Sequence, residues 1–225
     1  MDIFNYEFNL SFFRPRKDQY DLCTEWKNTS KNSGQLQELY AKHQENKEKA
    51  KELKSGDTTE AKKRKENPHL SVTTFDYQKI LIYRKGETSA LYYKRKYQTS
   101  NITTYDLGKH EGICYVYDEN TGKKGGNEVA SFVNHYIGTR KEEGVIQHRF
   151  YSDNCIPQNK NKIVLTGLLR AAAFCNVEII HRYLGKGHTQ NAGDSVHARI
   201  ERYTRNDEDL GSSSMVREDT GSQEI

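Results

Sequence analysis

The spacing of apolar and polar positions from residue 70 onward predicts alternating strands and helices. Residues 70–81 are rich in β-branched and aromatic side chains, and residues 90–107 and 111–119 alternate as half-buried strands do. These three are most simply arranged as consecutive antiparallel strands, because only a short turn separates the last two. The rest of the pattern predicts a helix at 127–143, a strand at 145–153, a helix at 161–175, a strand at 177–184 and a helix at 194–203.

Two segments of different character flank this region. Before it, residues 35–54 predict a helix with a narrow apolar stripe, followed by alternating Lys and Glu that suit a solvated helix stabilised by ion pairs. Pro68 ends that stretch, because the residue before a proline disfavours helix. After the region, residues 205–225 are acidic, rich in Ser and Gly, and without periodicity, which predicts disorder.

Three strands followed by helix, strand, helix, strand and helix is the order of the RNase H-like fold. The sequence therefore predicts an α/β domain with a mixed sheet at residues 69–204, an N-terminal extension at 1–68 and a tail at 205–225. We expect the helix at 161–175, which has an almost fully apolar face, to be well buried. A complete core of this fold would continue with more helix, so the sequence indicates a truncated domain.

Composition limits the chain to one core and indicates an intracellular protein. Of 225 residues, 34% are hydrophobic and 29% are charged, and the mean hydropathy is -0.98. No run of eighteen apolar residues occurs, and the first residues lack the features of a signal peptide, so we expect no membrane association. The four cysteines are widely spaced and contain no CxxC pair, which favours reduced thiols.

The charge of the chain is unevenly distributed. From Thr204 to the end there are six acids and two bases, so the rest of the chain carries about twice the total of +4. A basic body is typical of proteins that bind phosphate, although many basic proteins bind no nucleic acid.

Three aspartates fall where the RNase H-like fold carries catalytic carboxylates. Asp76 lies within the first predicted strand, Asp153 ends the fourth, and Asp194 opens the last helix. Asp153, followed by Asn154, is also typical of a turn, and Asp194 is also typical of a helix cap. Asp76 is harder to explain in this way, because a carboxylate among apolar strand residues is costly unless it is partnered. Together the three positions favour a catalytic, metal-binding triad.

Such a triad predicts two Mg²⁺ or Mn²⁺ ions as cofactors, because these ions prefer hard carboxylate oxygens. Two ions would stabilise the attacking and leaving oxygens of a phosphoryl transfer. Glu201, on the same helix as Asp194, competes for the place of the third ligand. His188 and His197 flank Asp194 closely enough to orient the ligands.

Basic and polar side chains near the predicted triad suggest contacts with DNA. The basic run at 94–96 lies beside aromatic residues and could follow a phosphate backbone, although a strand presents only alternate side chains to one face. The polar residues after Asp153 could bind phosphate or serve as ordinary caps. A second basic run, at 61–65, suits a nuclear-localisation or DNA-contact patch, or a solvated helix surface. The predicted nucleic-acid contacts are Lys94, Arg95, Lys96, Gln158, Asn159, Lys160, His188 and His197.

Four segments of the chain also resemble a known family. They are RPRKDQYDLC with the charged helix after it, TTFDYQ with SALYYKRKYQTSNITTYDL, FYSDNCIPQNKN, and YLGKGHTQNAGDSVHARIER. Between Arg14 and Arg205 the chain resembles a transposase-derived, RNase H-like (DDE-type) domain of unknown function that is multicopy in animal genomes. The resemblance implies Asp76, Asp153 and Asp194 as the acidic triad, with Asp194 preferred to Glu201.

The chain departs from the family pattern at two places. Tyr20 stands where the family has the first cysteine of an N-terminal pair, so Cys23 lacks its partner and a zinc site there is expected to be lost. Ile156 and Pro157 replace a Gly-Gly after the second acid, and Pro157 fixes its backbone and removes a donor. These changes fit a decaying copy at least as well as an active recombinase.

Three hypotheses about function follow. The first is a DDE-type transposase-derived domain in the nucleus that binds DNA and divalent metal, with strand-transfer or nuclease activity either retained or lost. The second is a domesticated, non-catalytic DNA-binding or scaffold protein on the same fold. The third is an RNase H-like nuclease of RNA or hybrids. The sequence leaves the oligomeric state open, and a homo-oligomer is compatible with it.

Overall fold

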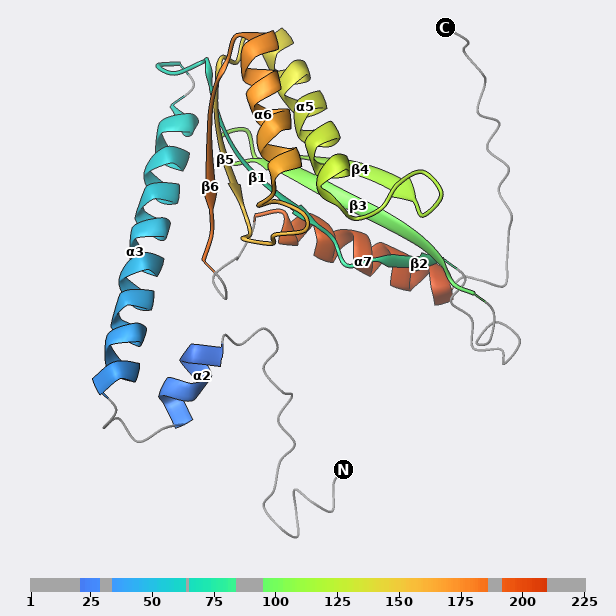
Figure 1. Ribbon diagram of the computed structural model, residues 1–225. Helices are drawn as coiled ribbons and strands as arrows, with labels where there is room; N and C mark the ends of the chain where they lie inside the picture. The colour runs from blue at the N-terminus through green and yellow to red at the C-terminus, as the bar shows by residue number, and fades with distance from the viewer. Residues whose placement is uncertain (1–20, 29–33, 64, 84–94, 186–191, 210–225) are drawn as a thin grey trace, which may run out of the picture.

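A mixed β-sheet with helices on both faces forms the centre of the computed structural model, which describes residues 21–28, 34–63, 65–83, 95–185 and 192–209 (Figure 1). Within those residues the strands are β1 (Leu70–Tyr77), β2 (Leu81–Tyr83), β3 (Tyr97–Asp106), β4 (Glu111–Asp118), β5 (Gln147–Ser152) and β6 (Glu178–Tyr183). The helices are α2 (Asp21–Asn28), α3 (Gly34–Lys62), α5 (Gly126–Glu142), α6 (Lys162–Cys175) and α7 (Asp194–Asp209). The prediction of an α/β fold with a mixed sheet is confirmed.

The sheet combines antiparallel and parallel pairs. β3 pairs antiparallel with β1 and β4, as predicted for the first three strands, while β5 is parallel to both β1 and β6. Thr99 of β3 pairs with Leu81 of β2 on one side and with Asp118 of β4 on the other. β2 therefore lies on the same side of β3 as β1, next to a different part of that strand. The main order is therefore β4-β3-β1-β5-β6, and β2 follows β1 after a break at residues 78–80. The single strand predicted at 70–81 is thus two strands.

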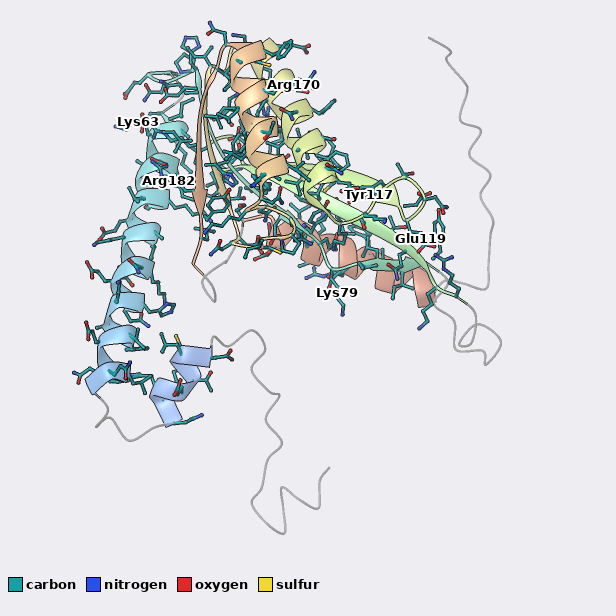
Figure 2. The ribbon with its side chains drawn as sticks, in the orientation of Figure 1. Lys63, Lys79, Tyr117, Glu119, Arg170 and Arg182 are labelled. Carbon is teal, nitrogen blue, oxygen red and sulfur yellow. The ribbon has the colours of Figure 1, made fainter. Side chains whose placement is uncertain are left out.

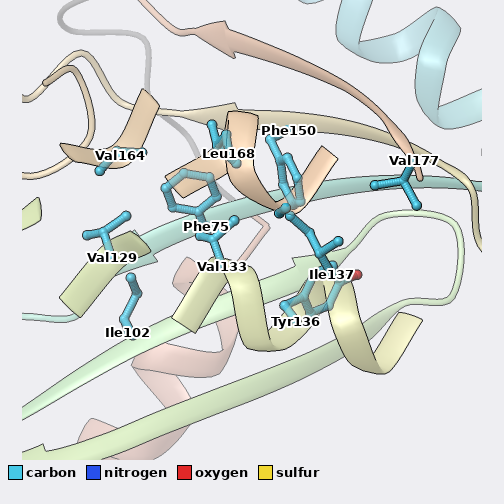
Figure 3. Close-up of a cluster of buried hydrophobic side chains, with 11 residues drawn as sticks. Phe75, Ile102, Val129, Val133, Tyr136, Ile137, Phe150, Val164, Leu168 and Val177 are labelled. Atoms are coloured by element: carbon cyan, nitrogen blue, oxygen red, sulfur yellow. The ribbon is translucent and has the colours of Figure 1, made fainter. Parts of the chain in front are cut away.

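One face of the sheet is covered by α5 and α6, which lie side by side over it (Figure 1). Figure 3 shows Phe75 of β1 and Phe150 of β5 directed toward Val133 of α5 and Leu168 of α6. Since alternate strand residues point to opposite faces, the neighbours of Phe75 in β1, including Asp76, belong to the other face.

A smaller part of the apolar surface of α6 is buried than the sequence predicts. Val164, Leu168 and Ala171 are buried against the sheet and α5, whereas Leu165 and Leu169 are 54% and 63% exposed. The helix is apolar on more than one side, and only the side that meets the core is covered.

The second face is covered by the C-terminal half of α3 and the start of α7. A second apolar cluster there joins Ala61 of α3 to Val72, Tyr151 and Ala192. A Cβ atom on Gly108 would lie 2.9 Å from the carbonyl oxygen of Ala61, so only glycine lets the β3–β4 turn approach the helix this closely. This end of α3 is therefore part of the packed fold rather than a solvated helix.

Ion pairs hold α3 to the edge of the sheet. Asp57 is buried and accepts hydrogen bonds from Arg149 (2.9 Å) and from the hydroxyl of Tyr151 (2.6 Å). Arg182 of β6, on the side of the sheet that faces α3 (Figure 2), also donates to Asp57, and Glu60 pairs with Arg149. Two strands and one helix are thus joined through one carboxylate.

The helix at the end of the domain is longer than predicted. α7 continues to Asp209, five residues into the segment for which the sequence predicted disorder, and residues 210–225 lie outside the described part of the chain. Among the helices that the structure describes, none is both long enough and apolar enough to cross a membrane.

Candidate functional site

Asp76 and Asp153 occupy corresponding positions on neighbouring parallel strands. Thr74 of β1 is paired with Tyr151 of β5, and each aspartate comes two residues later in its own strand or directly after it. Parallel strands lie about 4.8 Å apart, and a step of two residues keeps both side chains on one face. On its other side, Asp76 is paired with Thr103 of β3. The two carboxylates therefore share the face of the sheet that α3 and α7 cover.

The electrostatics of Asp76 reflect this crowding. Burial, followed by the charge of Asp153, raises the pKa of Asp76 from 3.8 to about 6, and the charge of Asp194 acts in the same direction. The backbone N–H of Tyr77, at 2.7 Å, and the ammonium of Lys124 oppose the rise in this pKa. Two further carboxylates are thus close enough to repel the charge of Asp76, as expected where acidic side chains converge.

Asp153 is fixed by the loop that follows β5. Its Oδ1 accepts hydrogen bonds from the backbone N–H of Cys155 (3.2 Å) and from the side-chain amide of Asn159. Asn159 is 1% exposed, and its carbonyl oxygen accepts a bond from the hydroxyl of Tyr183 of β6. Within the described residues, only Oδ1 of Asp153 is hydrogen-bonded, so Oδ2 is available to a ligand.

Asp194 is the first residue of α7, and hydrogen bonds hold the start of that helix against residues next to Asp76. The side-chain amide of Gln78 donates to the carbonyl oxygen of His197 (3.1 Å), and the imidazole of His197 bonds to the hydroxyl of Thr103 (3.0 Å). Gln78 also accepts a bond from Asn101 (2.9 Å). A buried polar network formed by Gln78, directly after β1, and by residues of β3 therefore sets the position of α7, and with it the third acid.

The alternative roles of these acids can now be compared with the structure. Gly193 precedes α7, so Asp194 lies in the first turn, where its charge is favourable to the helix dipole, rather than at the cap position. Asp153 does close a turn, through Cys155, but it also lies beside Asp76. Asp194 is exposed, and Glu201 is half-buried two turns along the same helix. Burial lowers the pKa of His197, and the charges of Asp194 and Glu201 partly offset this effect. Of these two acids, only Asp194 is among the main charges that act on Asp76.

Lys124 belongs to the site and was missed by the sequence analysis. Its ammonium donates to the carbonyl oxygen of Gln78 (2.6 Å) and lies 4.8 Å from the centre of the Tyr77 ring. Burial lowers the pKa of Lys124, and the charge of Asp76 partly offsets this effect. The surrounding sequence, GKKGG, has the composition of an ordinary turn, so nothing in it separated this lysine from the other lysines of the chain.

The predicted nucleic-acid contacts divide into four groups. Asn159 and His197 are buried, with Asn159 bonded to Asp153 and His197 bonded to Thr103, so in this structure they position other residues, and their contact with nucleic acid stays a prediction. Arg95 is exposed and paired with Glu119. Three others have at least partly accessible side chains on the described surface, namely Lys96, Gln158 and Lys160. Lys94 and His188 lie outside the described residues.

The donor chemistry of the three aspartates fits a hard divalent cation, since carboxylate oxygens are the preferred ligands of Mg²⁺ and Mn²⁺. A cation would also relieve the repulsion that raises the pKa of Asp76. As the side chains stand, no three Asp, Glu, His or Cys groups among the described residues are close enough together to hold one ion. Binding would therefore require the exposed Asp194 side chain to turn toward Asp76 and Asp153.

Comparison with known proteins adds no identification. No protein-family model matches the chain, and no curated protein is significantly similar to it. What the site can do is thus inferred from its geometry and chemistry.

Proposed function

We propose that the chain is an RNase H-like domain of the DDE transposase type, whose site supports metal-dependent phosphoryl transfer on DNA. Support for this fold assignment comes from the order β4-β3-β1-β5-β6, with β3 antiparallel to its neighbours and β5 parallel to β1 and β6. The succession of helices and strands after β4 agrees with the same fold. A nuclear location and a DNA partner would follow from this function.

The observation that carries the proposal is the pairing of Asp76 and Asp153 on one face of the sheet, with Asp194 in the first turn of the helix that covers this face. Asp76 and Asp153 lie side by side on β1 and after β5, and Asp194 begins the helix that packs on the same face. The three aspartates would hold Mg²⁺ or Mn²⁺, which when bound activates a hydroxyl or water and neutralises the leaving oxygen.

The surrounding residues have defined roles in this site. Asn159 keeps the carboxylate of Asp153 in one orientation, and Gln78 with His197 keeps α7 against the sheet. Lys124 places a positive charge beside Asp76, which moderates the repulsion between the carboxylates. The half-buried setting of Asp76 excludes part of the solvent, which strengthens each of these interactions.

A second candidate function is a non-catalytic DNA-binding or scaffold role on the same fold. The separation of the exposed Asp194 from the other two acids favours it, since no described set of three ligands is assembled. Pro157, in the loop that holds Asp153, also restricts the backbone next to the site. The two candidates differ in whether the aspartates bind metal.

Thermal unfolding with and without Mn²⁺ distinguishes the two candidates. At a hundredfold excess over the dissociation constant, a bound ion contributes about 2.7 kcal/mol, so we expect the melting temperature to rise by about 5–10 °C. Asp153→Asn should abolish the rise, whereas Glu142→Gln, which removes an exposed carboxylate at the far end of α5, should retain it. An unchanged melting temperature of the native chain would exclude the metal site and leave the non-catalytic function.

A further inference from the structure

The sheet has an open edge at β6. This strand is the outermost one on its side of the sheet, and in the described part of the chain it pairs with β5 alone (Figure 1). The N–H groups of Glu178 and Leu184, at the two ends of β6, donate to backbone oxygens on the β5 side, each at 2.8 Å. Successive residues of a strand direct their backbone groups to opposite sides, so every second residue of β6 points to the free edge. These residues are Ile179, His181 and Tyr183.

The side of α6 above this edge is apolar and uncovered. Gly167 faces α5, since a Cβ atom there would lie 3.0 Å from the Cβ atom of Ala130. Leu165 and Leu169 lie two residues to either side of Gly167 and therefore on the opposite side of the helix, where they are 54% and 63% exposed. Because α5 contacts β3 and α6 contacts β6, this side of α6, the α6 flank, overhangs the free edge.

We propose that a second copy of this chain docks on this surface, with the two β6 strands antiparallel and the two α6 flanks packed together. The contact is isologous, because the same edge and the same flank serve both copies about one twofold axis. α6 lies over β5 and β6, so the two helices stand about 10 Å apart, a distance at which leucine side chains interdigitate. One occupant thus covers both the open edge and the apolar flank. The dimer does not rest on the proposed function.

The sequence of β6 is complementary to itself in one register. When Ile180 faces Ile180 of the second copy, Ile179 faces His181 of the second copy, and these are the residues whose backbone groups point to the edge. Glu178 then faces Arg182 of the second copy. Within the described residues, both hydrogen bonds of Arg182 use Nη1, so Nη2 can meet this carboxylate. The twofold axis repeats the pairing, which gives two cross-strand ion pairs for each dimer.

The size of this surface suits a dimer that dissociates on dilution. α6 has 14 residues and is therefore about 21 Å long, similar to the length of β6 below it. The flank and the edge together bury on the order of 600 Å² on each copy, which is at the small end of stable interfaces. We therefore expect association at micromolar concentrations rather than a permanent dimer.

Sedimentation equilibrium of the native chain, from low to high micromolar concentration, tests the dimer. The flank variant Leu165→Glu, Leu169→Glu is compared with Ile163→Glu, Phe174→Glu, which places the same charges at exposed apolar positions on another side of α6. We expect the flank variant to associate at least tenfold more weakly, because its carboxylates are buried without partners, and the matched variant to associate as the native chain does. A native chain that stays monomeric at high micromolar concentration, or equal weakening in both variants, would overturn the proposal.

Disulfide cross-linking tests the register without any change in α6. Ile180→Cys places a thiol opposite itself across the twofold axis, so we expect mild oxidation to yield a covalent dimer. Glu178→Cys, which faces Arg182 of the second copy, and the native chain, which has four cysteines, serve as controls and should stay largely without cross-links. Equal cross-linking of Ile180→Cys and Glu178→Cys would contradict this register and overturn the proposal.

Hydrogen exchange at the edge distinguishes a second copy from another occupant. The amides of Ile179, His181 and Tyr183 should exchange more slowly as the protein concentration rises, because the dimer then pairs them. Protection that is the same at every concentration would mean that another segment of the same chain covers the edge, and the second copy would be excluded.

Discussion

We expect Asp76 to destabilise the protein at neutral pH when no cation is added. Burial and the charge of Asp153 raise its pKa from 3.8 to about 6 in the folded state. The unfolded chain loses this proton at the lower value, so folding becomes less favourable as the pH rises between the two values and stays so above about 6. Asp76→Asn should therefore stabilise the protein at pH 7.5 in EDTA by roughly 2 kcal/mol, measured by urea denaturation.

A second aspartate provides the matched control. Hydrogen bonds from Tyr97 and Thr121 lower the pKa of Asp118 to about 2, so its charge is favoured by the fold, and Asp118→Asn should destabilise the protein at pH 7.5. At pH 4, where Asp76 is protonated in the folded state, Asp76→Asn should have little effect. A loss of stability on Asp76→Asn in EDTA at pH 7.5 would contradict the convergence of charges on this residue.

Among single residues, the sequence anticipated that Asp76 and Asp153 lie at neighbouring strand ends, but not which residues support them. Asp76 and Asp153 could be found because the order of strands determines which strand ends are neighbours. The side chains of Asn159 and His197 point into the fold, where they bond to Asp153 and Thr103. No local sequence pattern indicates this orientation. Lys124 reaches the site through a bond to a backbone oxygen 46 residues away in the chain.

At the scale of elements, periodicity predicted most strands and helices to within a few residues, and burial less well. β4, α5 and α6 begin and end close to their predicted bounds, because turns with Gly or polar residues separate them. The sequence did not indicate which side of α6 is buried, because the helix is apolar on more than one side. The buried end of α3 could not be predicted, because the arginines that bind Asp57 are 92 and 125 residues away.

The attachment of α3 depends on Asp57. This carboxylate accepts hydrogen bonds from Arg149, Tyr151 and Arg182. Its removal therefore takes a negatively charged partner away from the guanidinium groups of Arg149 and Arg182. We expect Asp57→Ala to destabilise the protein by about 3 kcal/mol, as for other buried ion pairs that lose one partner. Urea denaturation measures this change, and limited proteolysis should show earlier cleavage within α3. Glu45→Ala, which removes an exposed carboxylate from the same helix, should change neither result.

At the scale of the whole molecule, the two ends of the sheet differ in their polar chemistry. The carboxylates lie where β1 and β5 end, whereas Arg140, Asp106 and His148 form a buried polar group toward the start of β5. The Nε atom of Arg140 lies 4.0 Å from Oδ2 of Asp106. The other two guanidinium nitrogens form ion pairs with Glu111 and Glu143. This second group joins α5, through Arg140, to the sheet, so substitutions there should alter stability without altering any response of the melting temperature to Mn²⁺.

We expect the fold to be sensitive to acid because of two buried histidines. Burial lowers the pKa of His148 and of His181 from 6.5 to about 4, and within the described residues neither ring nitrogen of His148 has a hydrogen-bond partner. The unfolded chain takes up protons first, so the free energy of unfolding should fall by about 3 kcal/mol for each histidine as the pH drops from 6.5 to 4. Protonation of Asp76 favours the folded state over the same pH range, but it offsets the effect of only one of the two histidines.

Denaturation with urea across this pH range, in the native chain and in His148→Leu, measures the contribution of one histidine. The substitution replaces an imidazole whose nitrogens have no hydrogen-bond partner among the described residues with an apolar side chain, so it should keep the protein folded at pH 7 and reduce the fall in stability by about 3 kcal/mol. His135→Leu, at an exposed position of α5, should leave the full fall in place. If His148→Leu shows the same pH dependence as the native chain, the acid sensitivity must arise from other groups, and the imidazole of His148 must already be solvated in the folded protein.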